Sequence, residues 1–441
     1  MRFLQIFRLI GILNFFLGLS MLFPLVASLM YSDGSFFSFL YAFLITSGSG
    51  IVVFYLIKKA DYTSLSQRES MAIVTLGWLS AGFFGSLPFL FSGSIGTITN
   101  AYFESISGFT TTGASILSNI ESLPKGILLW RSLTQWLGGM GIIVLSIAIL
   151  PFLGVGGMQL YKAEIPSPVV DKLQPRISET AKILWKVYFL ITVLEISFLS
   201  IGGMSLFDSI CHAFCTMPTG GFSTQNGSIA QFNNAYFEIV ITVFMILAGI
   251  NFSLHYKFLK GNLTIFGKDP ECRVFFLILG IFFLLVVLDI YGTVYRSLGH
   301  ACRYAIFQVA SIMTTTGFVS ADYAQWPGLS KIILLLCMFI GAMAGSTGGA
   351  IKIMRIMLLL KHSYQEIFRL VHPHAVRPVK LGGKSIPANV LSSVWGFFIL
   401  YLTLFIVAVV IMSLIGLDAE TSFASVAATI GNVGPGFGLV G

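Results

Sequence analysis

Long apolar runs alternate with short polar segments along most of the chain. A membrane helix needs about 20 apolar residues, whereas a barrel strand needs only about 9–11. Most of the runs reach helical length, and another begins near Leu329. The runs lie at about 3–31, 36–58, 71–91, 125–150, 181–202, 236–258, 273–293 and 390–415. The pattern therefore predicts an all-α integral membrane protein.

A shorter pattern recurs four times: a long run, a short helix of small residues, a glycine-containing turn and, in three of the four, a second long run. The short helices are expected at 99–109, 206–217, 300–313 and 419–430, and the turns at 110–114, 218–222, 314–318 and 431–436. The turn glycines are spaced by 108, 96 and 117 residues. A constant order with variable spacing predicts four tandem, parallel repeats around a central pore.

These repeats give a division of the chain. The first two helices have no turn between them, so they form a preface rather than another repeat. The last repeat is truncated, because its final inner helix would follow the end of the sequence. The predicted segments are a preface at 1–70 and repeats at 71–165, 166–262, 263–384 and 385–441.

Charge changes this picture only by fixing orientation. Charged residues make up 10% of the chain, compared with about 25% in soluble domains. With the N-terminus in the cytoplasm, 21 of the 26 Lys and Arg residues fall on the inner side, so the net charge of +8 reflects the positive-inside rule and not nucleic-acid binding. The outer side would carry acidic residues that draw cations to a mouth: Asp33, Glu104, Glu121, Asp208, Asp289, Asp322, Asp418 and Glu420.

The four turns have the chemistry of an ion filter. A cation that loses its water shell needs replacement oxygens, and rings of backbone carbonyls can supply them. Aiming successive carbonyls at one axis requires backbone conformations that are open mainly to glycine. The expected potassium ligands are the carbonyls of Thr111, Thr112, Gly113, Thr219, Gly220, Gly221, Thr315, Thr316, Gly317, Asn432, Val433 and Gly434.

A glycine-rich segment interrupts the third return helix, and we expect no such interruption in the other return helices. Each glycine costs a helix roughly 1 kcal/mol relative to alanine. We favour a gate loop that crosses the conduit below the filter, made of Gly345, Ser346, Thr347, Gly348 and Gly349. The alternative is close helix packing through small residues. Lys352 and Arg355 follow on one helix face and are interpreted as cytoplasmic end-of-helix charges.

Other polar residues give weaker signals. Glu195 lies inside an apolar run, where a charge is costly, so we expect a partner or a water-lined face. Cys211, His212 and Cys215 have the types of metal ligands, but packing in an apolar short helix is the favoured interpretation. The segment 372–374 is expected to be a loop and not a metal site.

With these residues in hand, the chain resembles the Trk/Ktr/HKT superfamily of potassium-transport proteins over nearly its whole length. Besides the turns, the resemblance is carried by Gly138–Ile143, Gly156–Tyr161, Ala344–Gly349, Arg369–Pro373 and Trp395–Phe398.

The resemblance implies potassium as the permeant ion, no organic cofactor, and a location in the bacterial inner membrane. It also implies a gate at 345–349, a homodimer with one pore per protomer, and a cytoplasmic ring of nucleotide-binding regulatory subunits. The last helix of the family would lie beyond Gly441.

Three other classes of function remain as alternatives. A proton- or sodium-coupled carrier would use Glu195 or Asp289. A membrane enzyme would need an acid–base or metal constellation near the interface, and the sequence offers no such cluster, so we expect no enzyme activity. A scaffold for other subunits would leave the four turns unexplained.

Overall fold

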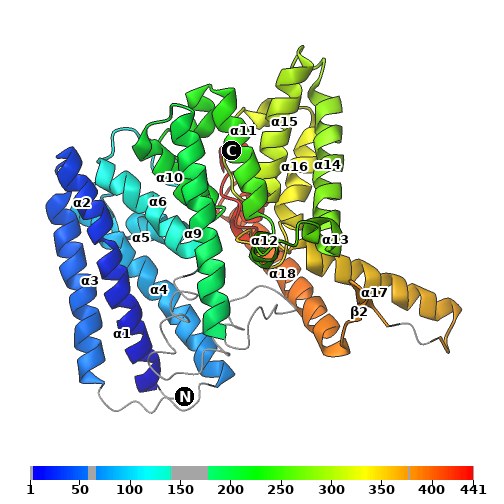
Figure 1. The fold of residues 1–441 in the computed structure, drawn as a ribbon, viewed down its shortest axis with the longest axis horizontal. Helices are drawn as coiled ribbons and strands as arrows, with labels where there is room; N and C mark the ends of the chain where they lie inside the picture. The colour runs from blue at the N-terminus through cyan, green and yellow to red at the C-terminus, as the bar shows by residue number, and fades with distance from the viewer. Residues whose placement is uncertain (1–2, 58–65, 140, 142–176, 376–377, 441) are drawn as a thin grey trace. The chain divides into compact units, whose positions relative to one another are not determined.

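The computed structural model describes residues 3–57, 66–139, 141, 177–375 and 378–440. Within these residues the regular structure is helical, apart from one antiparallel hairpin of β1 (Lys380–Leu381) and β2 (Lys384–Ser385). The predicted all-α class is confirmed. The chain forms two compact units, one ending at Asn233 and one beginning at Asn234, and each is described by itself (Figure 1).

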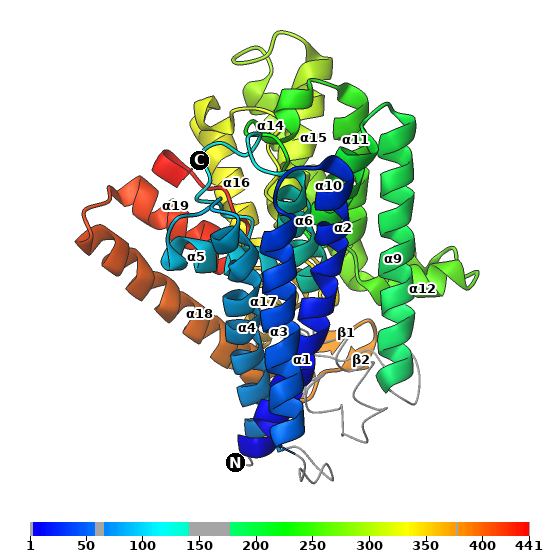
Figure 2. The same ribbon diagram turned by 90° about the vertical axis from the view of Figure 1, so that its left-hand side faces the viewer.

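Unit 1 contains two short helices, α5 and α10, and both pack against α6. The long helices α1, α3 and α4 run side by side (Figures 1 and 2). The elements are α1 (Phe3–Ser20), α2 (Leu22–Tyr31), α3 (Phe36–Leu56), α4 (Gln67–Phe91), α5 (Ile98–Phe109), α6 (Lys125–Gly139), α9 (Ile177–Ile201), α10 (Leu206–Thr216) and the 3-10 helix η2 (Ser228–Phe232).

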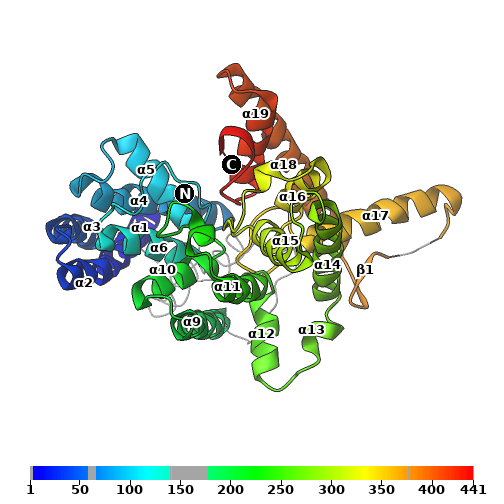
Figure 3. The same ribbon diagram turned by 90° about the horizontal axis from the view of Figure 1, so that it is seen from above.

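In unit 2 the helices α14, α15 and α16 pack together, α18 packs against α19, and α17 extends away from the bundle (Figure 3). The elements are α11 (Ala235–Ala248), α12 (Phe252–Leu259), α13 (Ile265–Lys268), α14 (Pro270–Ile290), α15 (Leu298–Met313), η3 (Tyr323–Gln325), α16 (Gly328–Ile340), α17 (Ile353–Val371), α18 (Ala388–Leu414), α19 (Ala419–Ile430) and η4 (Gly438–Val440).

Several helices have the length and composition of membrane spans. In the described part of the chain, six segments are long and apolar enough to cross a bilayer, and a seventh is counted if α11 and α12 form one bent span. Their apolar side chains are often exposed, as Leu288 of α14 is at 74% and Leu414 of α18 at 80%. Such faces need lipid as their solvent, and helices satisfy their own backbone there.

The short helices begin where the sequence places capping side chains. Thr97, Ser205 and Asp418 precede α5, α10 and α19, and each accepts a hydrogen bond from the backbone N–H three residues later. Such caps are each worth about 1 kcal/mol. The caps fix where each short helix starts, and therefore where it delivers its C-terminal turn.

A buried tryptophan positions α6 in unit 1. The ring of Trp130 lies edge-on to those of Phe39 and Phe109, and its Nε1 donates to the carbonyl of Gly85 at 2.9 Å. One side chain thus joins α6 to α3, α5 and α4. This fixes the helix whose next turns carry Arg131 and Gln135.

The second return helix differs from its prediction. We expected one uninterrupted helix at 236–258, but α11 ends at Ala248 and α12 starts at Phe252 after a bend of 99°. The prediction of a single break, in the third return helix alone, is therefore wrong. Gly249 lies so close to Thr314 that an added Cβ would be 2.8 Å from its methyl group, and Asn251 caps α12 by accepting from the N–H of Ser253.

Two smaller points concern other predicted helices. The first run, predicted as one helix at 3–31, is interrupted at Met21 between α1 and α2, although the two together still pass as one span. The run predicted at 125–150 is helical up to Gly139, and its remainder lies outside the described residues apart from Gly141. The motif at 156–161 also lies outside them.

Candidate ion-conducting site

Each of the four short helices ends in a turn with the same backbone pattern. Two residues with positive φ are separated by one residue whose φ is not positive. The pairs are Thr111 (57°) and Gly113 (77°), Thr219 (58°) and Gly221 (77°), Thr315 (61°) and Gly317 (81°), and Asn432 (59°) and Gly434 (97°). Alternation between left- and right-handed backbone points like groups of successive peptides to one side, as in anion-binding nests of N–H groups. Here the same alternation suits a row of carbonyls.

The sequence predicted left-handed backbone for the glycines of these turns, but not for the residues two places before them, although it named those residues among the expected ligands. Threonine at positive φ is uncommon and costs roughly 1–2 kcal/mol. No feature of the residue type marks Thr111, Thr219 or Thr315, whereas asparagine, at position 432, is among the residues that tolerate this region. Only the repeated position, two residues before the glycine, could have pointed to them.

The same backbone hydrogen bond closes all four turns. The residue before the turn glycine donates its N–H to the carbonyl of the residue six places before that glycine. The bonds run from Thr112 to Ser107 (2.9 Å), Gly220 to Cys215 (2.8 Å), Thr316 to Ser311 (2.8 Å) and Val433 to Ala428 (2.7 Å). The turns are therefore structural repeats and not only sequence repeats.

Each unit brings two turns into contact. In unit 1, a Cβ added to Gly113 would collide with the carbonyl oxygen of Gly220. In unit 2, a Cβ added to Gly317 would collide with the carbonyl oxygen of Val433. Glycine is thus needed twice over at these positions, for its positive φ and for the close approach of the neighbouring turn.

Polar side chains behind three of the turns tie the outgoing chain to the short helix. They stand nine residues before the turn glycine and are buried: Glu104, His212 and Gln308. Glu104 accepts from the hydroxyl of Ser115 at 3.0 Å, and Gln308 donates to the carbonyl of Ala321 at 3.2 Å.

His212 makes the equivalent contact in the second repeat, with its Nε2 3.0 Å from the Ser223 hydroxyl and its Nδ1 2.8 Å from the Asp208 carbonyl. Both ring nitrogens are therefore engaged by the protein. No group of three or more potential metal-binding side chains occurs among the described residues. The engagement of both ring nitrogens favours a packing role for His212.

Glu104 was counted among the acidic residues that would attract cations to an outer mouth, and the expectation of a free charge there is wrong. Its carboxylate is fully buried and pairs with Arg131 of α6, which is 1% exposed, at 2.8 Å. Arg131 also donates to the Ser223 carbonyl at 3.2 Å, and its guanidinium lies 4.2 Å from the ring centroid of Phe222. The pair therefore braces the first short helix against the second turn and adds no free charge to a mouth.

The predicted gate loop lies against both turns of unit 2. The N–H of Gly349 donates to the Thr315 hydroxyl at 2.7 Å, and the N–H of Ala350 donates to the Gly431 carbonyl at 3.0 Å. A Cβ on Gly348 would lie 2.9 Å from the Thr314 carbonyl oxygen. The loop is thus in direct contact with the start of the third and fourth turns.

The loop also forms hydrogen bonds with the break between α11 and α12. The N–H of Met343 donates to the Gly249 carbonyl, and the N–H of Phe252 donates to the Gly345 carbonyl, both at 3.1 Å. The Thr347 hydroxyl donates to the Ala248 carbonyl at 3.3 Å. Two broken helices therefore satisfy each other's exposed backbone groups, as non-helical backbone at membrane depth requires.

Two charged residues also bind the loop and the residues that flank it. Lys352 was interpreted as a cytoplasmic end-of-helix charge, but it is 2% exposed and donates from Nζ to the Ser346 carbonyl at 3.0 Å. Glu271 of α14 accepts from the N–H groups of Ala344 at 2.7 Å and Met354 at 3.0 Å. Glu271 was missed because an acidic residue in a first helical turn is ordinary.

Two remaining polar residues differ in their surroundings. Glu195 is fully buried on α9, where the side chain of Thr216 on α10 is the polar group that interacts with its carboxyl group. Arg355 is partly buried, with its guanidinium 4.0 Å from the ring centroid of Phe397.

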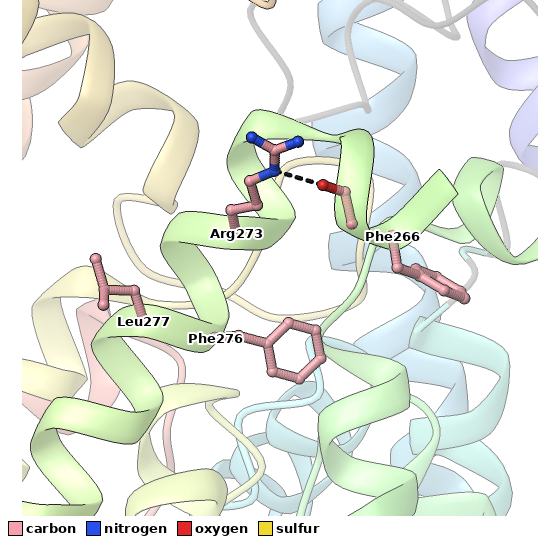
Figure 4. A pocket seen from close by; sticks show the side chains of 5 residues that line it. Phe266, Arg273, Phe276 and Leu277 are labelled. Carbon is pink, nitrogen blue, oxygen red and sulfur yellow. Dashed lines mark hydrogen bonds between the residues drawn. The ribbon is translucent and has the colours of Figure 1, made fainter. Parts of the chain in front are cut away.

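A surface hollow of about 520 Å³ lies at the corner between α13 and α14 (Figure 4). Phe266, Phe276 and Leu277 line it, and Arg273 donates from Nε to the carbonyl of Gly267 beside it. None of the predicted site residues lines this hollow, which leaves the turns and the loop as the candidate site.

Comparison with known proteins gives consistent similarities. The family described as "TrkH: Cation transport protein" matches residues 36–440. The chain is 44% identical to the Trk system potassium uptake protein TrkH of Escherichia coli K12, covering all of this chain and 92% of that protein. It is 41% identical to TrkH of Halomonas elongata, over 98% of this chain and 90% of that one. The crystal structure of the potassium transporter TrkH from Vibrio parahaemolyticus superposes with a TM-score of 0.89 at 39% identity, covering 100% of this chain and 92% of that chain.

Proposed function

Since the chain belongs to the TrkH family of cation transport proteins, we propose that it takes up potassium across the bacterial inner membrane through a gated, selective pore. The relatives are named as potassium uptake proteins. The apolar helices of the described residues make it a multi-pass membrane protein. Potassium is the cargo, and the proposal includes no organic cofactor and no enzyme activity.

The repeated geometry of the four turns is the observation that carries this proposal. Each turn follows the C-terminal end of a short helix, which has a partial charge of about −0.5 and favours a cation. Each turn also has the same alternation of φ and the same closing hydrogen bond. Backbone carbonyls presented in this way can replace the waters that a potassium ion loses.

We infer that the four turns together form the filter, with one turn from each of the repeats at 71–165, 166–262, 263–384 and 385–441. The proposed ligands are carbonyls of Thr111–Gly113, Thr219–Gly221, Thr315–Gly317 and Asn432–Gly434. The segment Gly345–Gly349 is the proposed gate, supported by its hydrogen bond to Thr315 of the third turn and by the bond from the next residue, Ala350, to Gly431 at the fourth turn.

Partners and orientation are also proposals. We infer a homodimer with one pore per protomer, regulated by a cytoplasmic ring of nucleotide-binding subunits, with the N-terminus in the cytoplasm. The relatives are named as members of a Trk system, which supports further components. The excess of Lys and Arg on the predicted inner side supports the orientation.

A second candidate is a proton-coupled carrier, and Glu195 favours it. A fully buried carboxyl group without an ion-pair partner among the described residues could bind and release a proton during transport. Under this proposal, Glu195→Gln abolishes the dependence of potassium flux on a pH gradient. A passive pore keeps its flux in this variant.

Uptake of potassium by cells that lack their own uptake systems tests the leading proposal. We expect the wild type to restore growth at low potassium, and Gly113→Ser and Gly434→Ser to lower the preference for potassium over sodium by roughly tenfold, equal to about 1.4 kcal/mol. Gly93→Ser is the matched control, because Gly93 also has positive φ (68°) but has open space around it. Unchanged potassium preference in both filter variants would disprove the filter.

A further inference from the structure

The side chain of Gln135 spans the second turn of unit 1. It comes from α6, is fully buried, and donates from Nε2 to the carbonyl of Gly220 at 2.7 Å. Its Oε1 accepts from the N–H of Phe222 at 3.1 Å. One carboxamide therefore binds a carbonyl and an N–H on either side of Gly221, in the way that a neighbouring strand would.

The contact requires an amide, because only a carboxamide offers a donor and an acceptor at this length. It also explains why position 220 is glycine, although its φ is not positive. A Cβ on Gly220 would collide with the carboxamide of Gln135. On its other side, the same Gly220 carbonyl abuts Gly113 of the first turn.

Among its described residues, unit 2 has no equivalent of this contact at the fourth turn, although it repeats the close approach of two turns. The residue after the fourth turn glycine is Pro435, which has no N–H to donate. The return helix α16 has the sequence GLSKIILLLCMFI and carries no amide side chain. The carbonyl of Val433 still abuts Gly317, as that of Gly220 abuts Gly113. The contact of the Gln135 carboxamide with Gly220 and Phe222 therefore makes the second turn chemically different from the fourth.

We propose that Gln135 is a specificity-determining residue of the filter. Its Nε2–H competes with the permeating cation for the Gly220 carbonyl, and so sets how strongly this oxygen takes part in coordination. Selectivity among alkali cations depends on the number and field strength of the coordinating carbonyls and on the size of the site. The inference rests on the proposed function and names one protein group that tunes it.

The test compares two variants that break the same contact from opposite sides. Gln135→Met keeps the length of the side chain but removes the donor and the strong acceptor. Gly220→Ala keeps Gln135 but displaces its carboxamide, which is the movable end of that side chain. The matched control is Ser132→Ala on the same helix, whose buried hydroxyl donates to the Leu128 carbonyl and lies beside the thiols of Cys211 and Cys215, without contacting Gly220 or Phe222.

Each protein is purified as the full chain and reconstituted into liposomes, and fluxes driven by potassium and by sodium gradients are compared. We expect both variants to change the potassium-to-sodium flux ratio by roughly fivefold or more, the order of one net hydrogen bond, and the control to keep it. The double variant should change the ratio no further than one single variant, because both act on one contact.

The outcomes separate the two proposals. A wild type without potassium-selective flux contradicts the proposed function itself. A selective wild type with a lower total flux but an unchanged ratio in both variants overturns the inference and leaves Gln135 a purely structural residue. Additive effects in the double variant also overturn it. If Gln135→Met does not fold, Gly220→Ala alone still decides, because its backbone conformation accepts alanine.

Discussion

Single residues in this chain often have two physical reasons for their identity. Gly113 and Gly317 need positive φ and also leave room for a neighbouring carbonyl. Thr111 and Thr315 take positive φ without glycine's freedom, and such strain persists only where the surroundings over-determine the backbone. The closing hydrogen bonds and the neighbouring turn supply that determination.

Asp33 gives a prediction at this scale. It lies between α2 and α3 and accepts from the N–H of Gly126 in the first turn of α6 at 2.6 Å, as well as from the N–H of Ser35 and the hydroxyls of Ser28 and Ser35. Partial burial alone would raise the pKa of Asp33, but these hydrogen bonds outweigh it and hold the pKa below its usual value.

Because the folded pKa is depressed, the stabilisation is present above the unfolded pKa of about 3.9 and is lost as pH falls through the folded pKa. We expect Asp33→Asn to lower the free energy of unfolding by about 1 kcal/mol at pH 7, limited by the partial exposure of the carboxylate. Thermal unfolding in detergent from pH 7 to pH 3 measures this. The difference from wild type should shrink below about pH 4, and the exposed Glu420→Gln serves as control. A difference that is constant with pH contradicts the assignment.

At the scale of single residues, the sequence could predict features that depend on local backbone conformation, but not those that depend on residues distant in the sequence. The turn glycines and the loop glycines were found because local backbone conformation selects the residue type. Glu104 and Lys352 were misjudged because their burial is set by tertiary packing. Glu104 meets a residue 27 positions away and Arg131 one 92 positions away. From the sequence alone, a charged residue is expected to be exposed to solvent, because its buried partner is not known.

At the scale of elements, broken helices meet one another in unit 2. The break between α11 and α12 frees carbonyls that the loop after α16 uses. The sequence predicted the second of these breaks from three glycines within five residues but missed the first, where only Gly249 and the capping Asn251 mark it. An isolated glycine in an apolar run is compatible with a continuous helix, so the run at 236–258 offered no clear signal.

Glu271 provides the prediction for this element. Its carboxylate joins both ends of the interrupted segment by accepting from Ala344 and Met354. Glu271→Ala should leave these N–H groups unpaired and favour displacement of the loop by about 2 kcal/mol, so that potassium leak through the reconstituted chain rises by tenfold or more.

Glu271→Gln retains an acceptor oxygen and should stay near the wild-type leak. The exposed Glu366→Ala on α17 is a second control for the loss of a carboxylate. Leak that is equal in Glu271→Ala and wild type, with both proteins folded in detergent, would show that this carboxylate does not hold the gate.

At the scale of the molecule, repeated turns within each unit are combined with an asymmetric charge distribution. Each unit contains two short helices whose turns touch, and the fold class and the order of elements were predictable from hydrophobic periodicity alone. Side-chain contacts within the units could not be predicted in this way. The hydrophobic pattern shows which residues are apolar, but not which residues they contact.

The orientation of the chain is the prediction for the whole molecule. With the N-terminus in the cytoplasm, the loop before α5 is outside and α17 is inside. A cysteine at Gly96, which has open space around it, should react with a membrane-impermeant maleimide on intact cells, and one at the exposed Glu366 should react only in inside-out vesicles. A Cys302→Ser background removes the native cysteine that is not buried. The reverse labelling pattern would contradict the proposed orientation.

The hydrogen bonds from the N–H groups of Gly349 and Ala350 to the Thr315 hydroxyl and the Gly431 carbonyl link the proposed barrier to the turns that carry the proposed coordinating carbonyls. Linked equilibria are thermodynamically reciprocal, so under this proposal an ion that stabilises one turn conformation must bias the barrier by the same free energy. Single-channel recordings of the wild-type protein test this. The closed-state dwell times in rubidium solution should differ from those in potassium solution.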